Sequence, residues 1–167
     1  MKTKISIKPN IEKSKVPYRR RENIREMPEV HVAGFCIKEE KSTIKVLIAK
    51  RNGDRILYPS LYEGCGGQLK GGETFEEGVL RHFSGEMSIL VAVYEDLHTF
   101  YVIREPSQPC IQGIAFLCRY LSGEPKSDNH SELKWVDIKE LKNMEDQSFI
   151  PNVKNEIISL VERYEKK

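Results

Sequence analysis

The sequence lacks three features that would each have narrowed its function: a long apolar run, a cysteine pair at metal-binding spacing, and a secretion signal. Apolar runs such as residues 89–93 and 114–118 are far shorter than the roughly 20 residues that a membrane-spanning helix needs. The first residues include several lysines but no apolar block followed by a small-residue cleavage site. We therefore expect a cytoplasmic protein that does not span a membrane.

The four cysteines carry no metal-site pattern. Cys36, Cys65, Cys110 and Cys118 show no C-x-x-C spacing, and no histidine stands at zinc-ligand spacing from them. Most of them fall within apolar, strand-like stretches. We expect buried free thiols.

The composition is that of one globular domain with a basic N-terminal arm. The chain has 167 residues, of which 39% are hydrophobic and 31% are charged. Net charge is only +2, but residues 1–27 hold nine Lys or Arg against three Glu, an excess of +6 that leaves −4 on the remaining 140 residues. We expect an arm over residues 1–28 and a compact domain over residues 29–167.

Two interpretations of this arm are open. It is either a solvated segment that adds an edge strand through residues 4–8, or a surface for polyanions that uses Arg19, Arg20 and Arg21. No aromatic residues are interleaved with the basic ones to stack on bases, which favours the first interpretation. Nucleic acid is therefore not the favoured partner.

Branched and aromatic residues predict a mixed sheet. A loop over residues 52–63 leads into a glycine-rich stretch at 64–67, and further turns are expected at 95–96 and 106–109. The predicted strands are residues 30–38, 44–51, 89–94, 98–104, 111–121 and 133–138.

Helix signals occur at three places. Thr74 and Glu77 fit a capping box, and the apolar spacing behind them predicts a helix to about Glu86. Asp137 indicates a second helix start, and Pro151 is expected to open a closing helix. The core-facing stripe of the first helix is Phe75, Val79, Leu80, Phe83 and Met87.

The spacing Gly67-x5-Glu73-x7-Arg81 resembles the opening of the Nudix box, G-x5-E-x7-R-E-U-x-E-E-x-G-U, where U is a bulky aliphatic residue. The pair Trp135-Val136 before a short helix is similar to the family's C-terminal end, so the resemblance spans about residues 30–145. It implies an α+β fold, a Nudix-like α/β/α sandwich with a mixed β-sheet.

The resemblance also implies a metal-dependent reaction that cleaves the pyrophosphate bond of a nucleoside diphosphate derivative. In the family, three box glutamates share one helix face and hold divalent cations such as Mg²⁺ or Mn²⁺. Here that face reads His82, Gly85 and Glu86. Only Glu86 carries over as a ligand and catalytic residue, with the Gly66 carbonyl as a second candidate ligand.

His82 has two open interpretations. It is either a packed helix residue or an imidazole ligand, and a ligand role would shift the metal preference toward manganese or zinc. Of the other box residues, Glu73 and Arg81 match a pair that braces the loop against the helix in the family. Gly67 is expected to permit a tight backbone conformation.

Residues outside the box are harder to select. Glu132 is our first choice for an additional catalytic carboxylate. Base recognition would fall to aromatic residues near the loop, for which Tyr58, Tyr62 and Phe100 are the candidates. Other acidic residues available for the carboxylate role are Glu95, Asp96, Glu105 and Asp128.

Three functions follow from the sequence. The first is a Nudix hydrolase acting on a nucleotide-type small molecule. The second is a Nudix-fold module that binds such a molecule after losing its catalytic metals, and the third is the processing of RNA ends through the basic arm. A homodimer is compatible with each of them.

Overall fold

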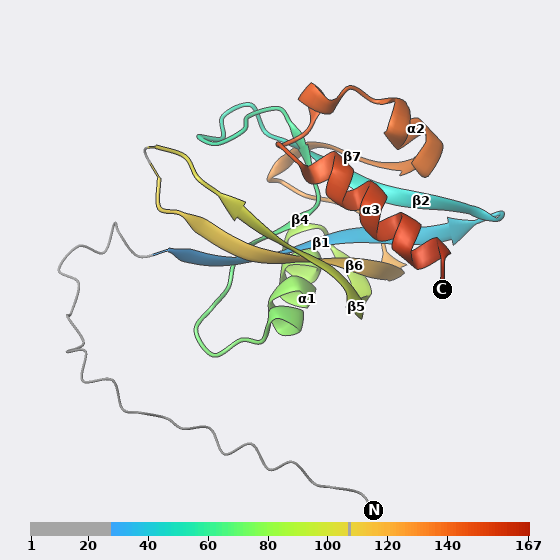
Figure 1. Cartoon of the computed structure of the whole chain (residues 1–167), viewed down its shortest axis with the longest axis horizontal. Coiled ribbons are helices and arrows are strands. Elements are labelled where there is room, and N and C mark those ends of the chain that lie inside the picture. Colours follow the sequence, from blue (N-terminus) through green and yellow to red (C-terminus); the bar gives the residue numbers. More distant parts are fainter. Residues whose placement is uncertain (1–27, 107) are drawn as a thin grey trace, which may run out of the picture.

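The computed structural model describes residues 28–106 and 108–167, so the predictions for the arm lie outside the described residues. Figure 1 shows α1 (Phe75–Glu86) on one side of a sheet and α3 (Val153–Glu165) on the other. A third helix, α2 (Ile138–Asn143), follows the last strand. The predicted α/β/α sandwich is therefore confirmed.

The sheet is mixed, as predicted. Its central order is β3-β2-β1-β6-β5, while β4 pairs with β1 and β7 pairs with β2. β1 and β6 are parallel, and the other pairs are antiparallel. The strands are β1 (Glu29–Glu40), β2 (Thr43–Arg51), β3 (Tyr62–Glu63), β4 (Cys65–Gln68), β5 (Ile89–Ile103), β6 (Ile111–Gly123) and β7 (His130–Asp137).

Two strand predictions need correction. The two segments expected at residues 89–94 and 98–104 form one strand, β5, with an irregularity between Val93 and His98 in place of a turn. The guanidinium of Arg163 in α3 donates to the backbone carbonyls of Asp96 and His98 at 3.0 and 2.9 Å, which holds this bulge. A side chain more than 60 residues away therefore keeps the strand continuous.

The glycine-rich stretch is also a strand rather than a loop. β4 pairs with β1, with Gly66 opposite Ala33. A side chain at Gly66 would place a Cβ atom 2.2 Å from the carbonyl oxygen of Val32, so only glycine allows this close approach. The glycines therefore bring the backbone of β4 tightly against the centre of the sheet.

The helix starts follow local capping chemistry. Thr74 caps α1, and Asp137 caps α2 by accepting from the Glu140 amide at 2.8 Å. α3 begins at Val153, two residues later than predicted from Pro151, after Asn152 adopts a left-handed φ of 73°. α1 ends at Glu86, as predicted, and Gly85 does not shorten it.

The core lies in two layers separated by the sheet. One layer packs against α1 through Val79 and Phe83, and the other packs against α3 through Ile157 and Leu160. Val79, Phe83 and Met87 of the predicted α1 stripe are buried, but Phe75 and Leu80 are 37% and 40% exposed, so these two residues do not face the core. The four cysteines are free, and three of them are fully buried, as predicted. Among the helices that the structure describes, none is long and apolar enough to cross a membrane.

Candidate ligand-binding site

The turn into α1 is fixed by a reciprocal capping box. The Thr74 hydroxyl accepts from the Glu77 amide at 3.1 Å, and the Glu77 carboxylate accepts from the Thr74 amide at 2.8 Å. Two amides at the start of the helix are thereby satisfied without tertiary contacts. This local signal was readable from the sequence, and it sets the position of every later residue on α1.

Glu73 and Arg81 join the loop before α1 to the helix. Arg81 donates from Nε and Nη2 to the two oxygens of Glu73 at 2.5 and 2.8 Å, and the Lys70 amide donates to the same carboxylate at 2.9 Å. Hydrogen bonding from Arg81 is the largest cause that lowers the pKa of Glu73 to about 2. Arg81 also reaches the Gln68 carbonyl at 3.2 Å, so it ties β4, the loop and the helix together.

His82 is buried and both of its ring nitrogens face acceptors. Nδ1 lies 2.5 Å from a carboxylate oxygen of Glu86, and Nε2 lies 3.3 Å from the carbonyl oxygen of Gln68. The His82 residue is 6% exposed. Because both partners accept, both contacts are hydrogen bonds only when the ring carries two protons. The carboxylate of Glu86 is therefore engaged by the buried ring of the neighbouring turn.

Gly67 makes room for this ring. A Cβ atom at Gly67 would lie 2.8 Å from Cε1 of His82, which is too close for any side chain. Gly85, in contrast, faces open space, and a methyl group at this position would meet no atom within 4 Å. The substitution at Gly85 therefore removes a box carboxylate without adding a packing contact.

These residues do not fit a bound Mg²⁺ or Mn²⁺ ion. Such ions take several oxygen ligands, whereas Glu86 is the single box carboxylate and one of its oxygens is engaged by His82. Glu132 accepts a hydrogen bond from the Tyr62 hydroxyl at 2.5 Å. Across residues 28–106 and 108–167, no three His, Cys, Asp or Glu side chains form a cluster able to hold a metal ion.

A pocket of about 320 Å³ lies on the side of the sheet that α3 covers. No residue of α1, all of which the structure describes, lines it; β4 contributes its glycines to one wall. Its apolar lining includes Phe35, Tyr101, Ile103, Ile111, Ile150 and Val153. Its ionisable lining is Glu29, His31, Arg51, Arg55, Tyr58, Glu63, Cys65 and Tyr101.

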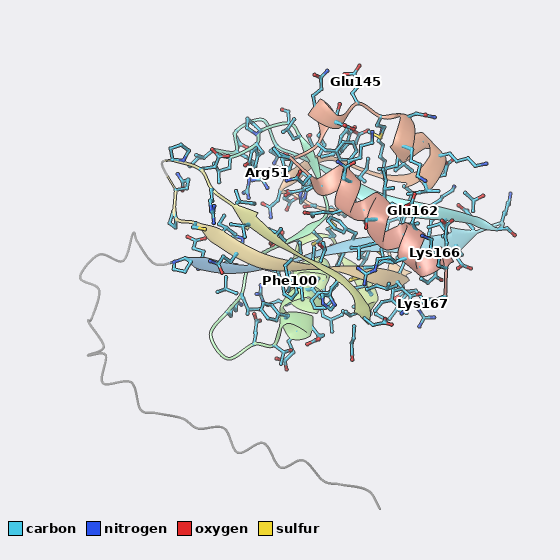
Figure 2. All side chains as sticks on the ribbon, in the orientation of Figure 1. Arg51, Phe100, Glu145, Glu162, Lys166 and Lys167 are labelled. Carbon is cyan, nitrogen blue, oxygen red and sulfur yellow. The ribbon has the colours of Figure 1, made fainter. Side chains whose placement is uncertain are left out.

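The predicted base-recognition residues separate in the structure. Tyr58 lines the pocket and donates to Glu105 at 2.6 Å, and its pKa is raised to about 12, chiefly by burial. Tyr62 is 8% exposed and packs against Phe149 in the core, outside the pocket. Phe100, labelled in Figure 2, is 74% exposed on β5 and does not line the pocket.

Sequence patterns missed most of the pocket. His31, Tyr101 and Ile150 come from three distant segments that only the folded sheet brings together. Arg51, also labelled in Figure 2, stood in the sequence as the last residue of a predicted strand and gave no functional signal. Its position at a strand end beside a loop was the one clue available.

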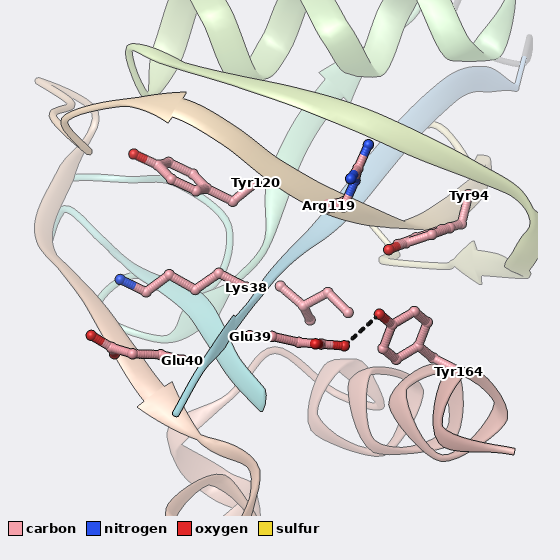
Figure 3. Close-up of a pocket in the computed structure, with 8 residues that line it drawn as sticks. Lys38, Glu39, Glu40, Tyr94, Arg119, Tyr120 and Tyr164 are labelled. Carbon is pink, nitrogen blue, oxygen red and sulfur yellow. Dashed lines mark hydrogen bonds between the residues drawn. The ribbon is translucent and has the colours of Figure 1, made fainter. Parts of the chain in front are cut away.

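A second cavity of about 510 Å³ lies at the other end of β1 (Figure 3). Its carboxylates already have partners, because Tyr164 donates to Glu39 at 2.7 Å and Lys45 lies 2.5 Å from Glu40. It contains none of the predicted site residues. The pocket beside β4 is therefore the stronger candidate.

Comparison with known proteins agrees with the fold and the box spacing. The sequence pattern of the NUDIX domain matches residues 27–155. No curated protein matches this chain.

Solved structures give the same architecture at low identity. A MutT protein from Methanosarcina mazei Go1 is 20% identical with a TM-score of 0.68, over 87% of this chain and 100% of that one. A C. elegans Ap4A hydrolase in a binary complex is 13% identical with a TM-score of 0.63, over 83% and 96%. A NUDIX hydrolase from Nitrosomonas europaea is 21% identical with a TM-score of 0.61, over 84% and 74%.

Proposed function

This chain belongs to the Nudix family, and we propose that it binds a nucleoside diphosphate derivative in the pocket beside β4 without using the box metals. The main observation in favour of the proposal is that the pocket lies apart from α1, the helix that carries the box. The pocket combines an apolar slot with two arginines, Arg51 and Arg55, whereas no α1 side chain lines it. Such a pocket suits a flat base joined to an anionic group.

The state of the box supports binding over catalysis. His82 occupies the place of a box glutamate, and its ring engages the remaining box carboxylate, Glu86. One oxygen of Glu86 therefore already has a partner within the protein. Ligand binding is therefore expected to be independent of metal.

A metal-dependent pyrophosphohydrolase is the second candidate function. Gly67, Glu73, Arg81 and Glu86 all stand at their box positions, and the Glu86 side chain is 30% exposed. In this case oxygens of the substrate itself would have to complete the coordination of a cation, because the side chains alone do not. The cytoplasmic location and the homodimer stay predictions.

Calorimetry on the full chain distinguishes these functions. Diadenosine tetraphosphate is a suitable probe, since two similar structures are described as Ap4A hydrolases, and ADP-ribose tests a second diphosphate derivative. Each probe is titrated in EDTA and in buffer with Mg²⁺ or Mn²⁺, and chromatography follows any product.

Binding in EDTA without product supports the proposed function. Binding and turnover that both require metal, and turnover that Glu86→Gln abolishes, would instead establish the hydrolase. Absence of binding to either probe under all conditions would overturn the proposal. Glu86→Gln is the matched variant because it keeps the size of the side chain and removes its charge.

A further inference from the structure

A bulge in β7 interrupts its pairing with the end of β2, opposite Arg51. Lys50 pairs with Glu132 of β7, whereas Arg51 pairs with His130, so Ser131 is passed over in the register. A bulge re-aims the side chain that follows it, and bulges are common beside functional sites. Here the extra residue is Ser131 of β7, and Arg51, a residue of the pocket lining, lies opposite it at the end of β2.

Arg51 is fixed in place by two neighbouring groups. Its Nε donates to the Leu57 carbonyl at 3.1 Å, and its Nη1 donates to both oxygens of Glu63 at 2.8 Å. These contacts restrain the plane of the guanidinium. The orientation of Arg51 is therefore set before any ligand arrives, which lowers the entropic cost of binding.

Glu63 is held in turn by a buried histidine. His130 donates from Nε2 to Glu63 at 3.1 Å, and its Nδ1 accepts from the Ser127 hydroxyl at 2.8 Å. The Ser127 oxygen also accepts from the Asn129 amide at 3.2 Å. The His130 side chain is 5% exposed, so this chain of hydrogen bonds is a rigid support.

One guanidinium nitrogen of Arg51, Nη2, is not used in these contacts. Within the part of the chain that the structure describes, Nη2 has no hydrogen-bond partner, and no buried side-chain nitrogen or oxygen lacks one. Nη2 is therefore accessible, although the side chain as a whole is only 14% exposed. Because Arg51 lines the pocket, its free N–H donors are available to a bound molecule.

The two arginines of the pocket differ in charge balance. Arg51 is compensated by Glu63 at 2.8 Å, so it offers donors with little net charge. Arg55 is exposed and forms no ion pair with another described residue. An anionic group is attracted by the uncompensated charge, whereas an oriented donor suits an uncharged acceptor.

We propose that Arg51 recognises the acceptor edge of a nucleobase and that Arg55 binds the phosphates. This assignment rests on the proposed function, since it requires a nucleoside diphosphate derivative in the pocket. Carbonyl oxygens and ring nitrogens of bases are the acceptors that arginine N–H groups commonly read. Arg51 thus determines base specificity, and His130 is a positioning residue that acts through Glu63.

The test compares ligands with and without a base. Calorimetry in EDTA measures the affinity of the full chain for GDP, ADP, CDP, UDP and inorganic pyrophosphate. Arg51→Lys keeps the charge but loses the planar fork, so affinity for the tightest nucleoside diphosphate should fall by roughly 5- to 150-fold. Affinity for pyrophosphate should not change.

Arg55→Gln is expected to act differently. It should weaken the nucleoside diphosphates and pyrophosphate by the same factor, and high salt should remove most of the effect because this charge is exposed. Arg119→Lys, in the cavity at the other end of β1, is the matched control and should alter neither affinity.

Glu63→Gln tests whether Glu63 compensates the charge of Arg51, because a purely structural role of Glu63 would not lead to tighter binding. It removes the charge that compensates Arg51, so pyrophosphate should bind roughly fivefold more tightly. It also covers the case in which Arg51→Lys fails to fold.

The results distinguish a failure of the Arg51 assignment from a failure of the proposed function. If Arg51→Lys weakens pyrophosphate as much as the nucleoside diphosphates, or if Glu63→Gln fails to tighten pyrophosphate, the assignment of Arg51 is wrong. In that case the pocket still binds nucleotides. If the wild-type chain binds none of the five ligands, the proposed function itself fails, and the assignment fails with it.

Discussion

The Nδ1 atom of His82 lies 2.5 Å from a carboxylate oxygen of Glu86, one turn further along α1. In the Nudix box both positions carry glutamate. Here an imidazole ring replaces one of the two carboxylates and contacts the other, so this helix face offers fewer oxygen ligands to a cation. Substitutions of this pair and of the residues packed around it should therefore have distinct effects.

Restoring two box glutamates should create a metal site. His82→Glu together with Gly85→Glu places three carboxylates on one face of α1, the arrangement that holds divalent cations. We expect Mn²⁺ binding with a dissociation constant of about 1 mM or tighter, measured by calorimetry, where the wild-type chain shows none. Adding Glu86→Gln to the double variant should weaken it again. Failure of the double variant to bind Mn²⁺ would show that the box backbone is also altered.

Gly67→Ala should destabilise the protein. Its new methyl group would lie 2.8 Å from Cε1 of the buried His82, and overpacking of this kind costs about 1–3 kcal/mol. Gly85→Ala is the control, because its methyl group meets nothing within 4 Å and should stabilise the helix by about 1 kcal/mol. Urea unfolding measures both changes, and equal effects of the two variants would contradict the packing argument.

Glu73→Gln should make the free energy of unfolding depend less steeply on pH in the acid range. The pKa of Glu73 is about 2 in the folded protein against an ordinary value of 4.5, so the charged form stabilises the fold above about 4.5. That contribution is lost as pH falls from 4.5 toward 2. In this window the free energy of unfolding of Glu73→Gln should fall less steeply than that of the wild type, measured by urea unfolding at several pH values.

Arg81→Gln tests the same ion pair from its other partner, over the same pH range. Since Arg81 is the main cause of the lowered pKa of Glu73, its removal should flatten the acid slope in the same way. A wild-type slope in either variant would mean that other groups govern acid unfolding.

Ser88→Gly should stabilise the protein by up to about 1 kcal/mol. Ser88 follows α1 with a left-handed φ of 57°, and it stands where the box has glycine. Glycine relieves this strain, although it also loses more backbone entropy on folding. Ser84→Gly, inside α1, should instead lower the midpoint of thermal unfolding. A lower midpoint for Ser88→Gly would show that no strain is stored there.

The sequence predicted those features that depend on neighbouring residues. The capping box of Thr74 and Glu77 and the strands predicted at 30–38 and 44–51 depend on local sequence, and the structure contains all of them. The two supposed strands on either side of Asp96 merge because Arg163 bonds the bulge, which no local pattern reveals.

In the candidate site, too, the sequence predicted local features but not contacts between distant residues. The box spacing identified Gly67, Glu73 and Arg81, which the structure brings together around α1. The partner of His82 on β4 and the support of Arg51 by His130 join residues far apart in the chain. Their geometry depends on strand register and on the bulge in β7 opposite the end of β2, so periodicity could not predict it.

The contact of Arg163 with β5 also bears on solubility. β5 is a border strand of the sheet, and an open border offers backbone groups to which a strand of another molecule can add. Two of its carbonyl oxygens, those of Asp96 and His98, are already taken by the guanidinium. The last turn of α3 therefore blocks two backbone acceptors of this border, and its loss would leave both open to pairing with another strand.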